Sequence, residues 1–196
     1  MNWAELMENA DICYTIKQPL HIKEYRLPGL PNLIDPDEYR PEPRSSRIKI
    51  AFAPTSKAPV TSPQSKGYFE VANILRELAT ERHIEILWIE KQAYETNLKT
   101  KQSAHILIDD VVTGNWHRTS LEGCCFSCAV LNNIKMEPFV PADLKTLKSV
   151  LIDLIDNPAK LREAQDRARF WVLTKWHAID QVKTYEEVYK GAIQCK

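Results

Sequence analysis

The sequence predicts an α/β fold, a Rossmann-like parallel sheet flanked by helices with a helical appendage at its C-terminal end. Three observations predict it. Short apolar runs alternate with helical patterns between residues 47 and 131, and only helical patterns follow from residue 141 onward. The 196 residues are 44% hydrophobic, which is enough for one core. Strands that alternate with helices favour a parallel sheet covered on both faces.

The N-terminal part predicts a strand and a connector ahead of the sheet. Residues 11–16 form a short apolar run, and residues 28–43 hold five prolines, which is typical of an extended connector. Apolar runs then predict strands at residues 47–53, 84–89, 105–108 and 128–131. Helical patterns predict helices at residues 67–82 and 94–103, and a short helix to residue 126 that Thr119 or Ser120 caps.

The C-terminal part predicts helices alone. Pro141 suits the first turn of a helix that reaches residue 155, because proline lacks the amide that a first turn leaves unpaired. Residues 156–158 read Asp-Asn-Pro, which ends that helix and caps the next, expected to reach residue 173. A last helix is expected over residues 179–192. These helices predict a docked appendage rather than a second sheet.

Charge and hydropathy argue against several classes of protein. The formal net charge is +0, with 26 basic and 26 acidic residues and no block of like charge, so we expect no nucleic-acid partner. No apolar stretch approaches the roughly 18 residues of a membrane helix, so we expect no transmembrane segment. Residues 1–11 carry no basic region of a signal peptide. A cytoplasmic location is the expectation.

The five cysteines do not predict a metal site. Cys125 and Cys128 have the two-residue gap of a metal or redox pair, but the chain holds no second pair to complete four ligands. We expect these residues to be buried packing residues, as free cysteines commonly are. No bound metal and no cofactor are predicted.

Ligands of open parallel sheets bind beyond the carboxyl ends of the strands, and three such places stand out. Lys66 and Gly67 precede the helix at residues 67–82. A helix start offers free amides and a positive dipole end, which suits a phosphate, and Lys66 adds a full charge. The pair is therefore either a diphosphate clamp or an ordinary solvated lysine before a helix.

The second place follows the strand at residues 105–108. Asp109 and Asp110 are expected to bind a metal, hold a sugar hydroxyl or cap the loop. Trp116 either stacks on a ligand ring or packs under the loop. His117 is a candidate phosphate donor or acid–base group. The third place is Glu122, expected in the first turn of the next helix, where it either binds ribose hydroxyls or complements the dipole.

In this order the features resemble a known pattern. The chain looks like the C-terminal, nucleotide-sugar-binding domain of GT-B-fold glycosyltransferases, in the glycosyl transferases group 1 family (family four). Residues 30–35 with 39–41 are similar to the interdomain connector of that family, and Lys66-Gly67 to its lysine-led helix start. Residues 104–109 resemble its Ala-Asp-(apolar)3-Asp strand, and residues 119–123 its Leu-Glu-Ala helix start. Gly114 stands where many members carry an acid.

The resemblance implies one half of a GT-B fold. Residues 1–43 are then a remnant of the N-terminal domain with the connector, residues 44–140 the nucleotide-sugar-binding domain, and residues 141–196 helices packing on it. It implies metal-independent transfer of a sugar from a nucleotide diphosphate to a hydroxyl acceptor, with retention. The implied partner is an N-terminal acceptor domain on a partner chain, or alternatively a second copy of this chain in a homo-oligomer. Lys57 is the candidate substitute for the family's second diphosphate-binding cation, an arginine. The implied donor-binding residues are Lys66, Gly67, Gly114, Trp116, His117, Thr119, Ser120 and Glu122.

Two other interpretations stay open. The chain is alternatively a non-catalytic nucleotide-binding or interaction module, that is, a truncated or degenerate glycosyltransferase. The run Ile108-Asp109-Asp110 also suggests a phospho-acceptor receiver domain, although receivers carry the acidic pair after their first strand. The sequence shows no hydrolase elbow, no Walker loop and no Gly-x-Gly-x-x-Gly fingerprint, and it has only five glycines.

Overall fold

A computed structural model describes residues 15–16, 29–54, 56–62 and 65–194. Its centre is a five-stranded parallel sheet in the order β4-β3-β5-β6-β7. The strands are β3 (Ile48–Phe52), β4 (Ile84–Trp88), β5 (Ile106–Ile108), β6 (Ala129–Asn132) and β7 (Val140–Pro141). The predicted Rossmann-like α/β architecture is confirmed.

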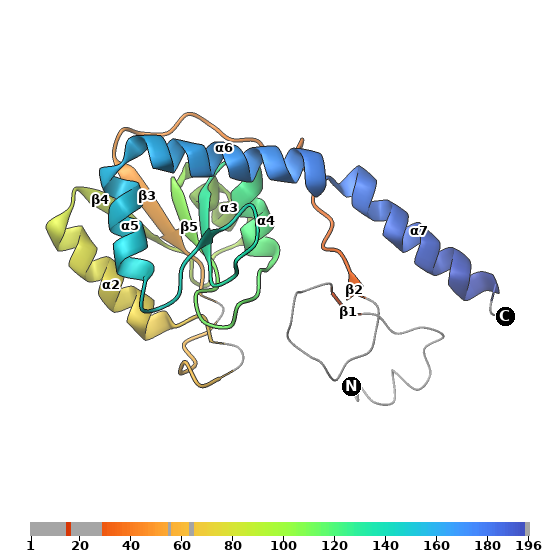
Figure 1. Cartoon of the computed structure of the whole chain (residues 1–196), viewed down its shortest axis with the longest axis horizontal. Helices are drawn as coiled ribbons and strands as arrows, with labels where there is room; N and C mark the ends of the chain where they lie inside the picture. Colours follow the sequence, from red (N-terminus) through yellow and green to blue (C-terminus); the bar gives the residue numbers. More distant parts are fainter. Residues whose placement is uncertain (1–14, 17–28, 55, 63–64, 195–196) are drawn as a thin grey trace.

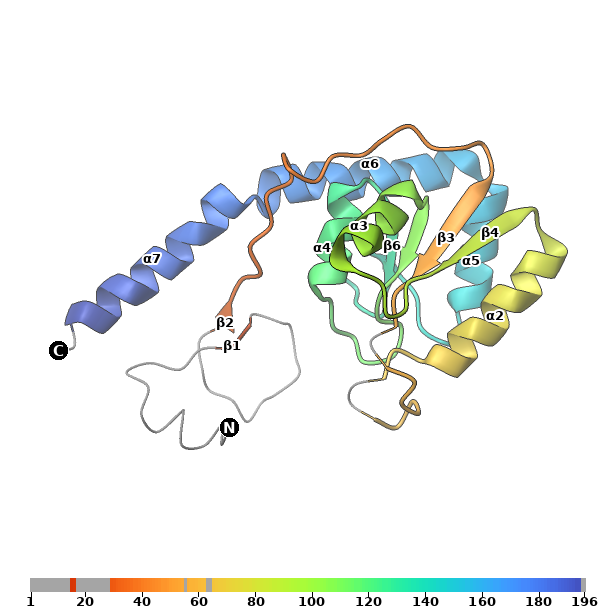
Figure 2. The same cartoon turned by 180° about the vertical axis from the view of Figure 1, so that it is seen from behind.

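Helices cover both faces of the sheet. The helices are α2 (Tyr68–Glu81), α3 (Tyr94–Ser103), α4 (Arg118–Cys125), α5 (Leu147–Asp156), α6 (Pro158–Lys175) and α7 (Ala178–Gln194). The two views show α2 and α5 over one face of the sheet and α3 and α4 over the other (Figures 1 and 2). Both layers shield the central strands from water.

Alternation along the strands produces two hydrophobic cores. Ile50 and Phe52 of β3 belong to the core under α2 and α5, whereas Ala51 belongs to the core under α4. In β5, Ile106 and Ile108 face the first core and Leu107 faces the second. Successive side chains of a strand point to opposite faces, so a central strand with both faces covered must be apolar throughout.

Helix α6 connects the two cores. Its N-terminal half joins the core under α2 and α5, and its C-terminal half joins the core under α4. Asn157 caps this helix by accepting a hydrogen bond from Lys160 N, and Pro158 occupies its first turn, as the Asp-Asn-Pro run predicts. Beyond α6 the chain continues into α7, which projects away from the sheet (Figure 1).

Three details differ from the sequence expectations. Pro141 lies in the short edge strand β7 rather than in a first helical turn, and edge strands tolerate a residue that cannot donate to the ladder. Helix α4 begins at Arg118 with His117 as its N-cap, so neither Thr119 nor Ser120 caps it. Consequently Glu122 lies beyond the first turn.

The N-terminal segment is described only in part. Of the strand expected at residues 11–16, Thr15–Ile16 (β1) is described and pairs in parallel with Gly29–Leu30 (β2). Residues 11–14 lie outside the described residues. From residue 31 to residue 47 the chain runs without helix or strand, which agrees with the predicted connector. The predicted domain boundaries after residues 43 and 140 stay predictions.

Candidate functional site

A buried polar network lies at the carboxyl end of β5 and is centred on Asp109. One carboxylate oxygen of Asp109 pairs with the Lys66 ammonium. The other oxygen accepts hydrogen bonds from Ser120 Oγ at 2.5 Å and from the backbone N–H of His117 at 3.1 Å. Asn132, at the end of β6, donates to Ser120 Oγ at 3.3 Å. The ends of two strands, the start of α2 and the start of α4 therefore meet at this aspartate.

The electrostatics of this network keep Asp109 ionised. Complete burial alone would raise the pKa of its carboxyl, but the positive charge of Lys66 and the nearby His117 side chain outweigh burial and hold the pKa well below its usual range. Lys66 is itself only 4% exposed. Its charge is thus compensated inside the protein rather than solvated, which differs from both interpretations drawn from the sequence.

Glu122 of α4 belongs to a second buried polar cluster. Its Oε2 accepts from Lys101 Nζ of α3 at 2.5 Å, and its Oε1 accepts from Arg118 Nε at 3.2 Å. The Tyr94 hydroxyl lies 3.5 Å from Oε1. Only 2% of Glu122 is exposed. Any ribose hydroxyl that binds this carboxylate has to replace one of these partners.

The two predicted anchors share one edge of the sheet. Lys66 contacts Asp109, Asp109 contacts Ser120, and Glu122 lies two residues farther along α4. Lys66 and Glu122 are therefore not on opposite sides of the molecule. The structure connects each of them to an internal partner, Asp109 for Lys66 and Lys101 for Glu122.

Gly67 shapes the start of α2. Its φ of 70° lies in the left-handed region, and a Cβ there would meet Leu144 Cδ2 at 2.9 Å and Val112 Cγ2 at 3.0 Å. Gly67 is the N-cap and has no side chain that could cap the helix, while Ser65 Oγ accepts a hydrogen bond from Gly67 N at 3.1 Å. Within the part of the chain that the structure describes, the amides of the first turn of α2 therefore lack an N-cap side-chain acceptor, which is the arrangement that anions exploit.

The loop after β5 has mainly structural contacts. Asp110 Oδ1 accepts from the backbone N–H of Val112 at 3.0 Å and of Thr113 at 2.8 Å, so this acid caps the loop. Gly114 has a φ of 76°, and a Cβ at this position would lie 3.1 Å from Asn133 O. Thr119 is half-buried within α4. The loop-capping alternative for Asp110 fits these contacts.

Trp116 is buried, with 3% of its surface exposed. Its ring lies 4.8 Å from that of Trp176 and 6.0 Å from that of Phe139, between centroids. This environment agrees with packing under the loop and leaves the ring no face for stacking on a ligand. His117 Nδ1 lies 3.4 Å from Asp109 Oδ2 without forming a hydrogen bond with the described residues.

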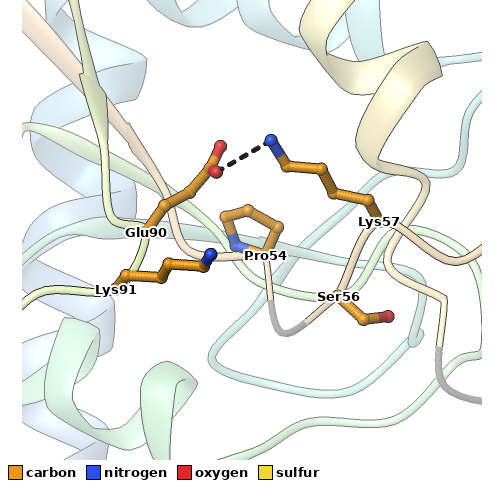
Figure 3. Close-up of a pocket in the computed structure, with 5 residues that line it drawn as sticks. All are labelled: Pro54, Ser56, Lys57, Glu90 and Lys91. Carbon is orange, nitrogen blue, oxygen red and sulfur yellow. Dashed lines mark ion pairs between the residues drawn. The ribbon is translucent and has the colours of Figure 1, made fainter.

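The structure adds a pocket that the sequence did not indicate. A cavity of about 360 Å³ lies beyond the carboxyl ends of β3 and β4 and is lined by Pro54, Ser56, Lys57, Glu90 and Lys91 (Figure 3). Lys57 pairs with Glu90 at 3.1 Å, and its Nζ lies 4.5 Å from the centroid of the Tyr68 ring at the start of α2. The pocket therefore presents solvent-accessible cations beside the open start of α2. Glu90 and Lys91 follow the end of β4, and this position after a strand could have indicated them from the sequence as candidate site residues.

The cysteine cluster has no metal-binding geometry among the described residues. Cys124, Cys125 and Cys128 are free and buried. Burial raises the pKa of the Cys125 thiol to about 12 and that of Cys128 to about 11. Such thiols are protonated and inert at neutral pH, which agrees with the expected packing role. Cys13 and Cys195 lie outside the described residues.

Comparisons with known proteins identify the class of the fold. No protein-family model and no curated protein sequence matches this chain. Among solved structures, the fold is similar to a half of a GT-B glycosyltransferase, an α/β domain with a Rossmann-like parallel sheet. Within the described residues, no helix is both long and apolar enough to cross a membrane.

Two TarM structures are among the solved structures with a similar fold. A mutant of S. aureus TarM, in complex with fondaparinux, α-GlcNAc-glycerol and UDP, superposes with a TM-score of 0.70 at 8% sequence identity. A second TarM structure gives a TM-score of 0.62 at 10% identity. The matches cover 94% and 95% of this chain but 45% of TarM in each case. The chain thus has the fold of one GT-B half and spans less than half the length of TarM.

Proposed function

We propose that this chain binds a nucleotide-diphosphate sugar at the carboxyl edge of its sheet. Together with an acceptor domain, it transfers the sugar to a hydroxyl acceptor with retention. The observation that carries the proposal is the cation-lined pocket beside the uncapped start of α2, where Lys57 and Lys91 remain accessible. A diphosphate placed there gains charge pairing and backbone hydrogen bonds together.

This placement gives Lys66 and Glu122 supporting roles. Lys66 holds Asp109, and through it the start of α4, against the helix start at Gly67. Because the charge of Lys66 is both paired and buried, most of the attraction for the leaving diphosphate comes from Lys91 and from Lys57, which is exposed although it pairs with Glu90. Charge that develops on a leaving group is stabilised by such preorganised donors. The reaction needs no metal when these donors neutralise the diphosphate.

The proposal is tested by thermal shift and calorimetry with nucleotide sugars. TarM was solved with UDP, so UDP-sugars are the first ligands and GDP-sugars the second. A bound ligand raises the melting temperature by mass action. We expect Lys57→Met to reduce the shift strongly, and Lys183→Met, an exposed lysine of α7, to leave it unchanged. Flat curves for every nucleotide sugar would overturn the proposal.

A second candidate is a nucleotide-binding module without catalysis. The observation that favours it is the internal pairing of Lys66 and Glu122, which withdraws two predicted donor ligands from the surface. Release of nucleoside diphosphate from a bound nucleotide sugar, in the presence of hydroxyl acceptors and with an acceptor domain supplied, separates the two. Binding without release selects the module, and release with a retained anomer in the product selects the transferase.

A further inference from the structure

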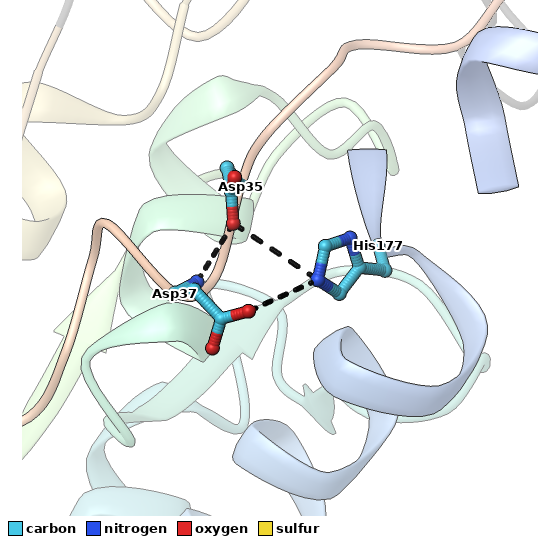
Figure 4. A group of neighbouring side chains, drawn as sticks. All are labelled: Asp35, Asp37 and His177. Carbon is cyan, nitrogen blue, oxygen red and sulfur yellow. Dashed lines mark hydrogen bonds and ion pairs between the residues drawn. The ribbon is translucent and has the colours of Figure 1, made fainter. Parts of the chain in front are cut away.

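A group of three potential metal ligands lies outside the sheet edge, where the connector meets the junction of α6 and α7. We propose that Asp35, Asp37 and His177 bind one divalent transition-metal cation of the zinc type (Figure 4). The proposal is independent of nucleotide-sugar binding. It departs from the sequence expectation that no metal is bound, because these ligands are about 140 residues apart and share no local motif.

One pair of the ligand atoms has the spacing of a tetrahedral site, and the other pairs are somewhat wider. His177 Nε2 lies 3.4 Å from Asp37 Oδ2 and 4.0 Å from Asp35 Oδ1, and all three residues offer ligand atoms within 4.8 Å of one another. Zinc bonds of about 2.0–2.1 Å in tetrahedral geometry separate neighbouring ligand atoms by about 3.3 Å. Small side-chain rotations therefore bring three ligands onto one cation and leave a fourth position for water.

The carboxylate side of the site is already held in place. Asp37 N donates to Asp35 Oδ1 at 2.9 Å, which fixes the turn between the two acids. Arg169 Nη1 of α6 donates to the carbonyls of Pro36 at 3.0 Å and Tyr39 at 3.1 Å. The turn is thus fastened to α6 without a metal. A preorganised site loses less conformational entropy when the cation binds.

The imidazole side is fastened in the same way. Ala178 N, next to His177, donates to Ile34 O at 3.0 Å, and Trp176 Nε1 donates to Asn32 O at 2.9 Å. His177 is therefore held between two residues that each bond the connector. Its ring stays opposite the turn of Asp35 and Asp37, and a cation there would tie the start of α7 to the connector.

The competing explanation is a histidine–aspartate contact alone. His177 Nδ1 accepts from Ile179 N at 3.3 Å, so the neutral ring carries its proton on Nε2, toward the carboxylates. Metal binding at Nε2 moves that proton to Nδ1 and ends the Ile179 contact. Arg40 approaches the other oxygen of Asp37, Oδ1, at 3.9 Å, and leaves Oδ2 facing the imidazole. Protonated imidazole competes with the metal, so binding weakens at low pH.

The test uses the full chain with ZnCl₂ in calorimetry and with CoCl₂ in absorption spectroscopy. We expect one cation per chain and the visible bands of tetrahedral Co²⁺ without the intense thiolate charge-transfer band that cysteine ligands would give. His177→Gln and Asp37→Asn should each weaken binding by about tenfold or more, because each removes a ligand. Asp180→Asn, an exposed acid in the first turn of α7, is the matched control and should bind as the parent does.

Two outcomes would overturn the proposal. One is the absence of Zn²⁺ and Co²⁺ binding by the parent chain, which would leave the histidine–aspartate contact as the complete explanation. The other is equal affinity in the parent and the His177→Gln variant, and a thiolate band would then place the metal on cysteines. Circular dichroism of each variant separates loss of a ligand from loss of the fold.

Discussion

The Lys66 ammonium and the Asp109 carboxylate form a buried ion pair that joins the start of α2 to the end of β5. Their side chains are 5% and 0% exposed. Breaking such a pair by removing one partner leaves a charge without compensation in a medium that solvates it poorly. This pair is therefore expected to stabilise the candidate site in the absence of a ligand.

We expect Lys66→Met to lower the free energy of unfolding by about 3 kcal/mol, because Asp109 would stay buried without its cation. The double variant Lys66→Met/Asp109→Asn should recover more than half of the loss, since no lone charge remains. Urea unfolding followed by circular dichroism measures both. Lys57→Met removes one partner of an exposed pair and should leave the unfolding midpoint unchanged. A Lys66→Met variant as stable as the parent would contradict the role given to this pair.

Acid stability should depend on Asp109. Its pKa is lowered in the folded protein, so its ionised form contributes stability above the unfolded pKa of about 3.9 and loses that contribution as the pH falls toward the folded pKa. The parent chain should therefore lose stability between pH 5 and pH 2 more steeply than Lys66→Met/Asp109→Asn. Urea midpoints across that range, on the two proteins in parallel, provide the comparison. Equal slopes for the two proteins would show that other carboxylates dominate the loss of stability in acid.

The secondary structure could be predicted where local patterns are strong. The bounds of α3 match the predicted residues 94–103, and the helix predicted at residues 67–82 is α2. The strand β7 was missed because two residues, one of them Pro141, show no alternation. The start of α4 was misplaced because His117 forms the N-cap without a side-chain hydrogen bond, so no capping residue marks it.

The candidate site could be predicted only in part. Lys66, Asp109 and Glu122 were each indicated by their positions after strands or at helix starts, but their burial and pairing arise from tertiary packing. Lys101, the partner of Glu122, lies in a polar helix whose sequence gives no sign that this one lysine is buried. Residues that follow different strands become neighbours only when the sheet order is known.

Two glycines in helices should respond in opposite ways to alanine. At Gly123 of α4 a Cβ would lie 2.5 Å from Leu107 Cδ2 and 2.9 Å from Val130 Cγ2, so Gly123→Ala overpacks the interface with the sheet and should destabilise by about 1–3 kcal/mol. A Cβ added at Gly191 of α7 would meet no atom of the described residues within 4 Å. Gly191→Ala should stabilise by about 0.5–1 kcal/mol through helix propensity, measured as a rise in the melting temperature. A neutral Gly123→Ala would contradict the close approach of α4 to the sheet.

The buried thiols should be chemically silent in the native state. Cys124, Cys125 and Cys128 are buried, and burial raises the pKa of each, so the reactive thiolate is scarce at neutral pH. In a Cys13→Ser/Cys195→Ser background, a disulfide reagent at pH 8 should label almost no thiol until urea unfolds the chain, and three thiols afterwards. The labelling rate should then follow the opening of the fold, because the reagent reacts only with exposed thiolate. Rapid native labelling of this variant would show that the second core, where α4 packs on the sheet, is accessible to solvent.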